Sequence, residues 1–494
     1  MLLLGIDIGT SSIKVSVVNA TTGKCIVSAQ YPEEETTMIS HHPGWAEQSP
    51  QMWWENVQQA ILKANASNLY SPKDISAIGI AYQMHGLILV DKEQNILRDA
   101  IIWCDSRAVE IGNKAFREIG EDRCLSRLLN SPGNFTASKL FWVKENEPDI
   151  YQNVDKVLLP GDYIAMKLSR HITTTISALS EGIFWDFKED RISNDILSYF
   201  GFLKSFFPSI QPVFSEHGQL CKDIADSLSL TAGIPITYKS GDQPNNALSL
   251  NILHPGEVAA TAGTSGVIYG VTNQLISDQQ SRINTFAHVN HVNDNNRLGA
   301  LLCINGTGIL YQWLKAQFSN ALPYSLMNKE AEQIAAGSEG LAILPFGNGA
   351  ERMLNNKMVG AHIHNTDLNL HTRAHIFRAA QEGIAFAFRY GLDIMRENGM
   401  SPKIIRAGKA NLFLSEVFTE SFANATRVPV EIHQTDGSIG AALGAGIGAN
   451  LFSAENAFLS KQPSKIIHPQ PTEQFEVAYH RWKNLLQTHI SESL

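Results

Sequence analysis

The sequence lacks the features that mark nucleic-acid-binding and membrane-spanning proteins. It contains no run of lysine and arginine, and 39 basic residues stand against 48 acidic ones, for a formal net charge of −9. General nucleic-acid binders usually carry a basic excess instead. No stretch comes near the roughly 20 consecutive apolar residues that a membrane-spanning helix needs. We therefore expect neither nucleic acid nor a membrane among the partners of this chain.

Cysteine is also scarce. An odd, dispersed set without paired spacing is typical of reduced thiols in a cytosolic protein rather than of a disulfide framework. The opening residues MLLLGIDIGT lack the basic segment of a signal peptide and predict a strand. We expect a cytoplasmic location. The five cysteines are Cys25, Cys104, Cys124, Cys221 and Cys303.

With 494 residues the chain exceeds what one hydrophobic core usually supports, so two or more domains are expected. Strand-like and helix-like segments alternate along it. Residues 75–81 form an apolar, β-branched run, whereas residues 51–64 place apolar side chains at helical spacing. This alternation predicts an α/β fold with a largely buried sheet. Residues 373–395 predict a long amphipathic helix, whose apolar stripe we assign to core packing.

One short pattern occurs twice. Residues 2–18 predict a strand, a tight Gly-Thr-Ser turn and a second strand, and residues 257–270 repeat this order. Two halves that each open on such a turn predict two related domains facing a shared cleft. We place the domains at residues 1–247 and 248–494.

Both turns have the composition of a phosphate-binding loop. In the first, glycine lets the backbone approach a ligand, while N–H groups and Thr/Ser hydroxyls can bind phosphate oxygens. Asp7, at the strand end beside this turn, can hold Mg²⁺ directly or through water. An isolated turn of this kind is more often an ordinary hairpin. The second turn, residues 263–266, repeats the chemistry, and the pair favours a nucleotide cleft.

Two polar segments follow strand-like runs near the proposed cleft. Asp242 lies in residues 240–246, and a carboxylate there can accept a proton from a hydroxyl that attacks a γ-phosphate. Asp and Asn are also favoured in plain polar turns, so spacing leaves both interpretations open. Residues 83–86, QMHG, offer an amide, an apolar contact and an imidazole for a polyol, although a lone histidine is more often structural.

The remaining histidines do not predict a zinc site from their spacing. His288 and His291 form an HxxH pair, but no third ligand accompanies them at a suitable distance along the chain. We expect no zinc at this pair, and none at the scattered His362, His364, His371 and His375.

Taken in order, these motifs resemble the FGGY carbohydrate kinases over nearly the whole chain, and most closely the xylulokinases. Residues 5–14 are similar to the first phosphate motif of the family, and residues 44–50 are typical of its N-terminal domain. QMHG is similar to the sugar-contact segment of xylulokinases, where glycerol kinases carry an Arg-Glu pair. Residues 136–146 agree with the family signature T-x-x-K-[apolar]-x-W.

The resemblance implies two actin-like ATPase (ribonuclease H-like) domains, with sugar held mainly by the first and nucleotide by the second. It implies transfer of phosphate from ATP to D-xylulose, with Asp242 as the general base and Asp7 holding Mg²⁺ through water. The implied sugar contacts are Met84, His85, Asn134, Asp242 and Gln243, and the implied nucleotide contacts are Thr10, Ser11, Thr264, Gly308, Gln312, Gly408 and Asn411.

The second half departs from the family pattern. Residues 406–411 stand where the family usually has Gly-Gly-Gly-Ala, and only Gly408 preserves the close backbone approach to adenosine. Ala407 would be strained if its φ had to be positive, and Lys409 is expected to reach solvent. The other departures are one extra residue within 348–353 and the polar Gln381 where an apolar residue commonly precedes glutamate.

Two alternative functions stay open. A kinase of the same family for ribulose, fuculose, rhamnulose or gluconate would differ in only a few pocket contacts. A non-catalytic actin-fold sensor of sugar or nucleotide would suit the altered adenosine segment, although Asp242 beside two intact turns favours catalysis. The sequence leaves the oligomeric state open, with a homodimer as one expectation.

Overall fold

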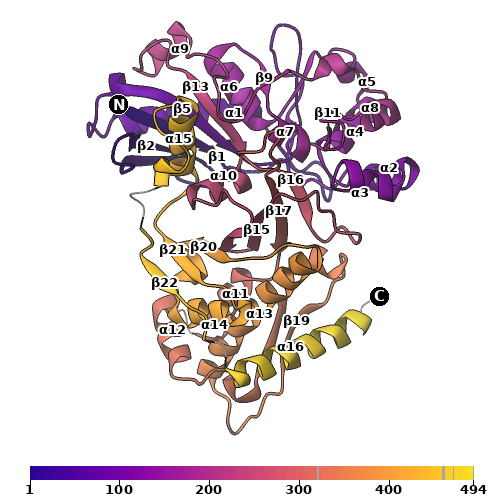
Figure 1. Cartoon of the computed structure of the whole chain (residues 1–494), viewed down its shortest axis with the longest axis vertical. Helices are drawn as coiled ribbons and strands as arrows, with labels where there is room; N and C mark the ends of the chain where they lie inside the picture. Colours follow the sequence, from indigo (N-terminus) through magenta and orange to yellow (C-terminus); the bar gives the residue numbers. More distant parts are fainter. Residues whose placement is uncertain (320–321, 459–461, 471, 493–494) are drawn as a thin grey trace.

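The computed structural model describes the chain except for residues 320–321, 459–461, 471 and 493–494. Two sheets dominate it, one in the upper and one in the lower half of Figure 1. The first has the order β13-β5-β1-β2-β3 and the second the order β16-β17-β15-β14-β20-β21-β22. The first contains β1 (Leu2–Ile8), β2 (Ile13–Asn19), β3 (Cys25–Tyr31), β5 (Ile75–Tyr82) and β13 (Ile236–Gly241). The second contains β14 (Glu257–Ala262), β15 (Gly266–Thr272), β16 (Asn284–Ala287), β17 (Leu298–Ile304), β20 (Ile404–Gly408), β21 (Val430–His433) and β22 (Lys465–Ile467).

Five strands of each sheet have the same order and the same relative directions. In the first sheet β1, β2 and β3 form an antiparallel meander, and β5 and β13 continue it in parallel on the other side of β1. In the second sheet β14, β15 and β17 form the meander, and β20 and β21 are the parallel strands. The predicted α/β fold is confirmed. This shared arrangement explains why the strand, turn and strand pattern occurs twice in the sequence.

Helices cover both sheets. Helix α1 begins where Ser49 accepts a hydrogen bond from the Met52 backbone and Pro50 occupies the first turn. The helices of the first half are α1 (Pro50–Asn65), α2 (Val109–Ile119), α3 (Glu121–Arg127), α4 (Thr136–Asn146), α5 (Pro148–Tyr151), α6 (Pro160–Ser169), α7 (Ile176–Glu181), α8 (Asn194–Phe200), α9 (Lys222–Ser227) and α10 (Asp242–Ser249). Those that follow are α11 (Gly308–Phe318), α12 (Tyr324–Glu332), α13 (Arg373–Glu397), α14 (Glu416–Thr426), α15 (Gly437–Gly448) and α16 (Glu473–Glu492).

Short strand pairs connect these elements. They are β4 (Glu47–Gln48) with β7 (Ala100–Ile101), β6 (Ile88–Val90) with β8 (Lys156–Leu158), β9 (Thr173–Thr174) with β12 (Ser209–Ile210), β10 (Trp185–Asp186) with β11 (Arg191–Ile192), and β18 (Ala342–Phe346) with β19 (Gly360–His364). In the described part of the chain no helix has both the length and the apolar content needed to cross a bilayer.

Helix α13 has the core role that its apolar stripe predicts. Phe377, Ala380, Ile384 and Phe388 are buried in the core of the second half, and Ile376 packs against that core from a partly buried position. The observed helix extends two residues beyond the predicted end, to Glu397.

Helix α15 belongs to the second half of the sequence but packs on the first sheet, against β1, β5 and β13 (Figure 1). Its small side chains allow a close approach to the sheet. A Cβ added at Gly5 of β1 would lie 1.9 Å from the carbonyl oxygen of Ser438 in the helix. A division of the sequence at 247/248 therefore differs from the division by packing, because residues 437–448 lie with the first sheet.

Strand β16 joins the two halves. The ring of Phe286 lies 5.9 Å from that of Phe135. Ser177 donates a hydrogen bond to the Ala287 carbonyl at 2.8 Å, and the Asn130 amide donates one to the Thr285 carbonyl at 2.7 Å. The edge of the second sheet is thus bonded to the helical region of the first half.

Candidate active site

The carboxyl ends of three parallel strands form one edge of the expected cleft. Ile8 of β1, Tyr82 of β5 and Gly241 of β13 lie in register across the sheet. Residues next to them therefore converge on the same edge. Asp242 directly follows β13 and begins α10, as the strand-end interpretation predicts, while Gln83 directly follows β5.

Two buried carboxyl groups at this edge, those of Asp7 and Asp242, have raised pKa values. Burial raises the pKa of Asp242 to about 7, and the charge of Asp7 adds to the rise, while hydrogen bonds from Gln243 oppose it. Burial also raises the pKa of Asp7 to about 6; the charge of Asp436 adds to this rise, and that of Lys14 opposes it. Paired carboxyl groups with raised pKa values are stabilised by a nearby cation. Their oxygen atoms suit Mg²⁺, so this cluster fits a bound Mg²⁺.

The start of α15 lies directly beside Asp7. A Cβ added at Gly437 would lie 2.1 Å from Asp7 Oδ2. Asp436 caps the helix by accepting a hydrogen bond from the Ile439 backbone, and its other oxygen lies 2.5 Å from Lys14 Nζ. Residues from the first strands and from the start of α15, far apart in the sequence, therefore lie around the Asp7 carboxylate.

Hydrogen bonds link the first phosphate-type turn to the QMHG segment. Trp103 Nε1 donates to Thr10 Oγ1 at 2.9 Å, and Thr10 Oγ1 donates to Gln83 Oε1 at 3.2 Å. Gln48 Nε2 donates to the Thr10 carbonyl at 2.8 Å. Ser11 is exposed beside them. The Thr10 hydroxyl is thus held between the turn and the proposed sugar segment, and Trp103 is a site residue that the sequence prediction missed.

Lys139, the lysine of the T-x-x-K signature, holds the backbone of QMHG. His85 has a φ of 61°, in the left-handed region that non-glycine residues seldom adopt. Lys139 Nζ donates to the carbonyl oxygens of His85 and Ile102, each at 2.9 Å. The amine is fully buried, and burial lowers the pKa of Lys139 to about 7. The signature lysine therefore supports the left-handed conformation of His85.

The ring of His85 is neutral and oriented. Burial lowers the pKa of His85 to about 3. Its Nδ1 lies 3.1 Å from the Glu181 carbonyl, which can only accept, so Nδ1 carries the proton. The rings of Phe135 and Phe286 lie 4.8 Å and 5.3 Å away. Nε2 is therefore the ring nitrogen that can accept a hydrogen bond from a sugar hydroxyl.

Glu181 is an acidic residue of this site that the sequence prediction did not identify. Its side chain is 2% exposed, and Oε2 lies 3.9 Å from His85 Nδ1. Burial holds the pKa of Glu181 well above its usual value, and the charge of Asp242 adds to the effect. A buried carboxyl group with a raised pKa therefore lies behind His85. No local sequence signal marks it, because Glu181 ends helix α7 and its neighbour His85 comes from a distant segment, after β5.

Two further predicted sugar contacts, Met84 and Asn134, lie near His85 and Asp242. A Cβ added at Gly241 would lie 2.6 Å from Met84 Cγ, so Met84 covers the strand end that leads into Asp242. Asn134 directly precedes Phe135, and its side-chain amide donates to the Asp105 carbonyl. The structure brings Met84, His85 and Asp242 together and places Asn134 next to them in the chain.

A cavity of about 410 Å³ in the second half is lined by four predicted nucleotide residues: Thr264, Gly308, Gln312 and Asn411. The Gly308 N–H donates to the Gly263 carbonyl at 2.9 Å, and a Cβ at Gly308 would lie only 2.3 Å from that oxygen. Glycine is required there so that α11 can begin against the turn. Gly408, at the end of β20, is not among the residues that line this cavity.

A hydrogen-bonded network lies beneath this cavity. Gln381 Nε2 donates to Tyr311 Oη at 2.8 Å, and Tyr311 Oη donates to Asn328 Oδ1 at 2.9 Å. Ser415 Oγ donates to Gln381 Oε1 at 2.6 Å. The rings of Tyr311 and Tyr324 stack with their centroids 5.8 Å apart. The polar Gln381, which departs from the family pattern, thus forms hydrogen bonds with Tyr311 and Ser415, two residues that line the cavity.

Ala407, in the altered adenosine segment, is free of the strain considered above. Ala407 pairs with Ala260 inside the sheet, is fully buried and has no positive φ. Lys409 is exposed, as predicted. Arg406 does not line the 410 Å³ cavity and binds Glu431 at 2.8 Å and Glu257 at 3.2 Å.

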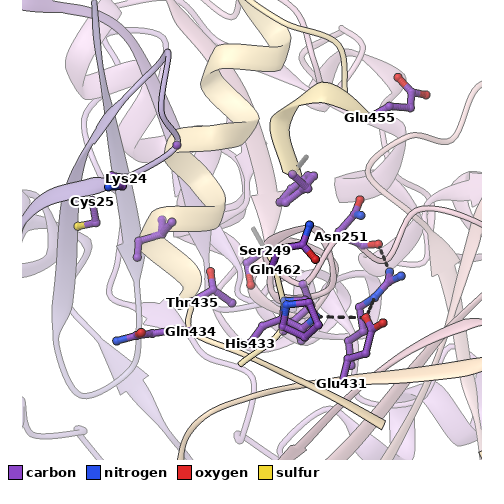
Figure 2. Close-up of a pocket in the computed structure, with 16 residues that line it drawn as sticks. Lys24, Cys25, Ser249, Asn251, Glu431, His433, Gln434, Thr435, Glu455 and Gln462 are labelled. Carbon is purple, nitrogen blue, oxygen red and sulfur yellow. Dashed lines mark hydrogen bonds and ion pairs between the residues drawn. The ribbon is translucent and has the colours of Figure 1, made fainter. Parts of the chain in front are cut away.

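A larger cavity, of about 680 Å³, is lined by Ser249 at the end of α10 (Figure 2), whereas Asp242 begins that helix. Asn251, from the link between the sheets, and Thr435, from the link into α15, both line it. His433 Nε2 lies 3.3 Å from Glu431 in its wall. The cavity therefore lies where the chain crosses between the halves, and the predicted catalytic residues lie elsewhere.

Comparison with known proteins agrees with this geometry. The model of the N-terminal domain of the FGGY family of carbohydrate kinases matches residues 2–249, and that of the C-terminal domain matches residues 258–450. The xylulose kinase of Escherichia coli (strain K12) is 28% identical over 444 residues, covering 90% of this chain and 88% of that protein. The xylulose kinase of Bacillus subtilis (strain 168) is 26% identical over 506 residues, covering 99% and 97%.

Solved structures show the same fold. The xylulose kinase from Rhodospirillum rubrum superposes with a TM-score of 0.88 at 24% identity over 99% of each chain. The gluconate kinase from Lactobacillus acidophilus has a TM-score of 0.87 at 20% identity over 99% of this chain and 98% of its own. Because the two family models together span the first sheet, nearly all of the second, both Gly-Thr-Ser turns and the strand ends around Asp242, this chain belongs to the FGGY family of carbohydrate kinases, ATP-dependent enzymes with a two-domain, actin-like fold.

Proposed function

We propose that this kinase transfers the γ-phosphate of ATP to D-xylulose and forms D-xylulose 5-phosphate. The observation that carries the proposal is the arrangement of QMHG, in which a neutral His85 with a free Nε2 acceptor lies beside Met84 and Asp242. The names of the curated relatives support the same sugar. Met84, His85, Asn134 and Gln243 are the proposed sugar contacts.

Asp242 is the proposed general base. As the terminal hydroxyl of the sugar forms its bond to the γ-phosphorus and the bond to the β-phosphate oxygen breaks, a carboxylate oxygen of Asp242 accepts the hydroxyl proton. Proton transfer comes late, because phosphoryl transfer is commonly loose. Asp7 would hold Mg²⁺ through water, and Mg²⁺ when bound neutralises charge on the phosphates. Thr10, Ser11 and Thr264 would contact the phosphate oxygens.

The nucleotide is proposed to occupy the cavity beside α11. Gly308, Gln312 and Asn411 line it, and the stacked Tyr311 and Tyr324 supply aromatic surface. Gly408 lies at the adjacent strand end, where its backbone could meet adenosine after the domains close.

A sugar panel tests the substrate. We expect D-xylulose to give the highest kcat/KM, by about 10-fold or more, in a coupled ADP-release assay against D-ribulose, L-fuculose, L-rhamnulose, D-gluconate and glycerol. A higher value for another member would reassign the sugar and leave the kinase family untouched. Absence of sugar-dependent ADP release across the panel would favour the sensor function.

Gly308→Ala is expected to raise the KM for ATP by about 10-fold and to leave the KM for the sugar nearly unchanged. The added methyl group would lie 2.3 Å from the Gly263 carbonyl and would push the second turn away from the phosphates. Steady-state kinetics with each substrate varied in turn measures this. Lys409→Ala is the control, since its side chain is exposed and does not line this cavity, and it should leave both KM values unchanged.

A further inference from the structure

Three histidines that are far apart in the sequence meet in the second half. His362 and His364 lie on β19, two residues apart, so their side chains share one face of the strand. His489 lies near the end of α16, which runs beside β19 in Figure 1. One ring nitrogen of each lies within 4.8 Å of the others. The spacing of His362 and His364 alone gives no hint of the third histidine.

The spacing of the nitrogens approaches that of a metal site. His489 Nε2 and His364 Nε2 are 3.2 Å apart. Tetrahedral Zn²⁺ with Zn–N bonds of about 2.0–2.1 Å separates two ligand nitrogens by about 3.3–3.4 Å. The ring of His362 lies 3.8 Å from that of His489, centroid to centroid. Because these two rings are stacked, with their planes 15° apart, one of them has to turn out of the stack before three nitrogens can face one ion.

Acceptor groups occupy the other nitrogens of two of these rings. His362 Nε2 lies 2.8 Å from the Val359 carbonyl, which can only accept, so Nε2 carries the proton and Nδ1 keeps its lone pair. His489 Nδ1 lies 3.6 Å from a carboxylate oxygen of Glu492. Metal-bound histidines typically have such a carbonyl or carboxylate behind them, because it orients the ring and increases its basicity.

The cluster also favours neutral rings, the form that binds metal. Three imidazoles this close repel one another when protonated. Burial lowers the pKa of His364, and the neighbouring His489 and His362 lower it further. Imidazole ligands suit Zn²⁺ and related transition metals, whereas Mg²⁺ prefers oxygen.

We propose that His362, His364 and His489 bind one divalent transition-metal ion of the Zn²⁺ type, with water as a further ligand. The ion would fasten the end of α16 to the β18–β19 hairpin. Hydrogen bonds already join these elements: Trp482 Nε1 donates to the Ile343 carbonyl at 2.9 Å, and Lys357 Nζ donates to the Ile490 carbonyl at 2.7 Å. The site is structural and separate from the carboxylates of the proposed catalytic cluster.

Titration of the full chain with ZnCl₂ tests the site. After treatment with a chelator and its removal, calorimetry without ATP is expected to show one saturable equivalent, and Zn²⁺ should raise the Tm by about 2 °C or more. Co²⁺ should give the visible absorption of a four-coordinate ion. The triple variant His362→Ala, His364→Ala, His489→Ala should lose all three responses. His480→Ala, an exposed histidine on the same helix, should keep them.

Failure of the wild-type chain to bind one equivalent of Zn²⁺ would overturn the proposal, whatever the variants do. Binding of equal stoichiometry and affinity by a folded triple variant would also overturn it. Kinase activity and the Tm in chelator establish that the variant is folded. If the triple variant is unfolded, His364→Gln alone serves instead, with the same expected loss of the Co²⁺ spectrum.

Discussion

Replacing Asp242 with asparagine is expected to lower kcat by about 10²–10⁴-fold, with a much smaller change in the KM for the sugar. Asparagine preserves the size of the side chain at the start of α10 but cannot accept the hydroxyl proton. The coupled ADP-release assay at saturating ATP and D-xylulose measures the loss. Asp190→Asn, on an exposed turn, is the matched control and should retain full activity. Turnover near the wild-type value would remove Asp242 from the role of general base.

The pH dependence provides a second test of the same residue. Because the pKa of Asp242 is raised to about 7, its base form is depleted below that pH, and wild-type kcat/KM should fall on the acid side. The residual activity of Asp242→Asn should lack this step.

The raised pKa also has a consequence for stability. A carboxyl group whose pKa is higher in the folded than in the unfolded protein contributes stability at low pH, and that contribution is lost as pH rises through about 7. Asparagine stays neutral at every pH, so the variant does not lose this stability as pH rises. The Tm of the variant should therefore exceed that of the wild type at pH 8, and the difference should shrink at pH 5.

Lys139→Met is expected to lower kcat/KM for the sugar by about 10²-fold while the KM for ATP stays close to the wild-type value. Lys139 Nζ donates to the carbonyl oxygens of His85 and Ile102, and without it the left-handed conformation of His85 loses its support. A displacement of about 1 Å in a positioning group can cost about 10²-fold in rate. Steady-state kinetics with each substrate varied separates the two effects.

Lys144→Met is the matched control. Lys144 lies on the same helix, and its amine donates to the Phe200 carbonyl, away from QMHG. It should leave the sugar kinetics unchanged. Equal losses in the two variants, or a parallel loss of ATP binding in Lys139→Met, would show that the effect is one of folding and would contradict the positioning role. Tm values of both variants distinguish these outcomes.

The sequence by itself determined the local elements and their order. Strand periodicity and the Gly-Thr-Ser turns depend on neighbouring residues, so the two hairpins and the strand end at Asp242 could be predicted within a few positions. The family motifs in addition predicted kinase activity and the candidate residues for it. They could not indicate that Lys139 binds the backbone of His85, because a hydrogen bond between residues 54 positions apart leaves no periodic trace.

Only the tertiary structure decided which distant segments meet. Helix α15 is apolar and rich in small residues, a pattern that predicts close packing but does not indicate against which sheet. In the folded chain it packs on β1. Glu181 joins His85, and His489 joins His362 and His364, through strand and helix packing. Hydrophobic patterns specify which face is buried, whereas side-chain partners depend on the register and crossing of whole elements, and these are set by the packing of the complete chain.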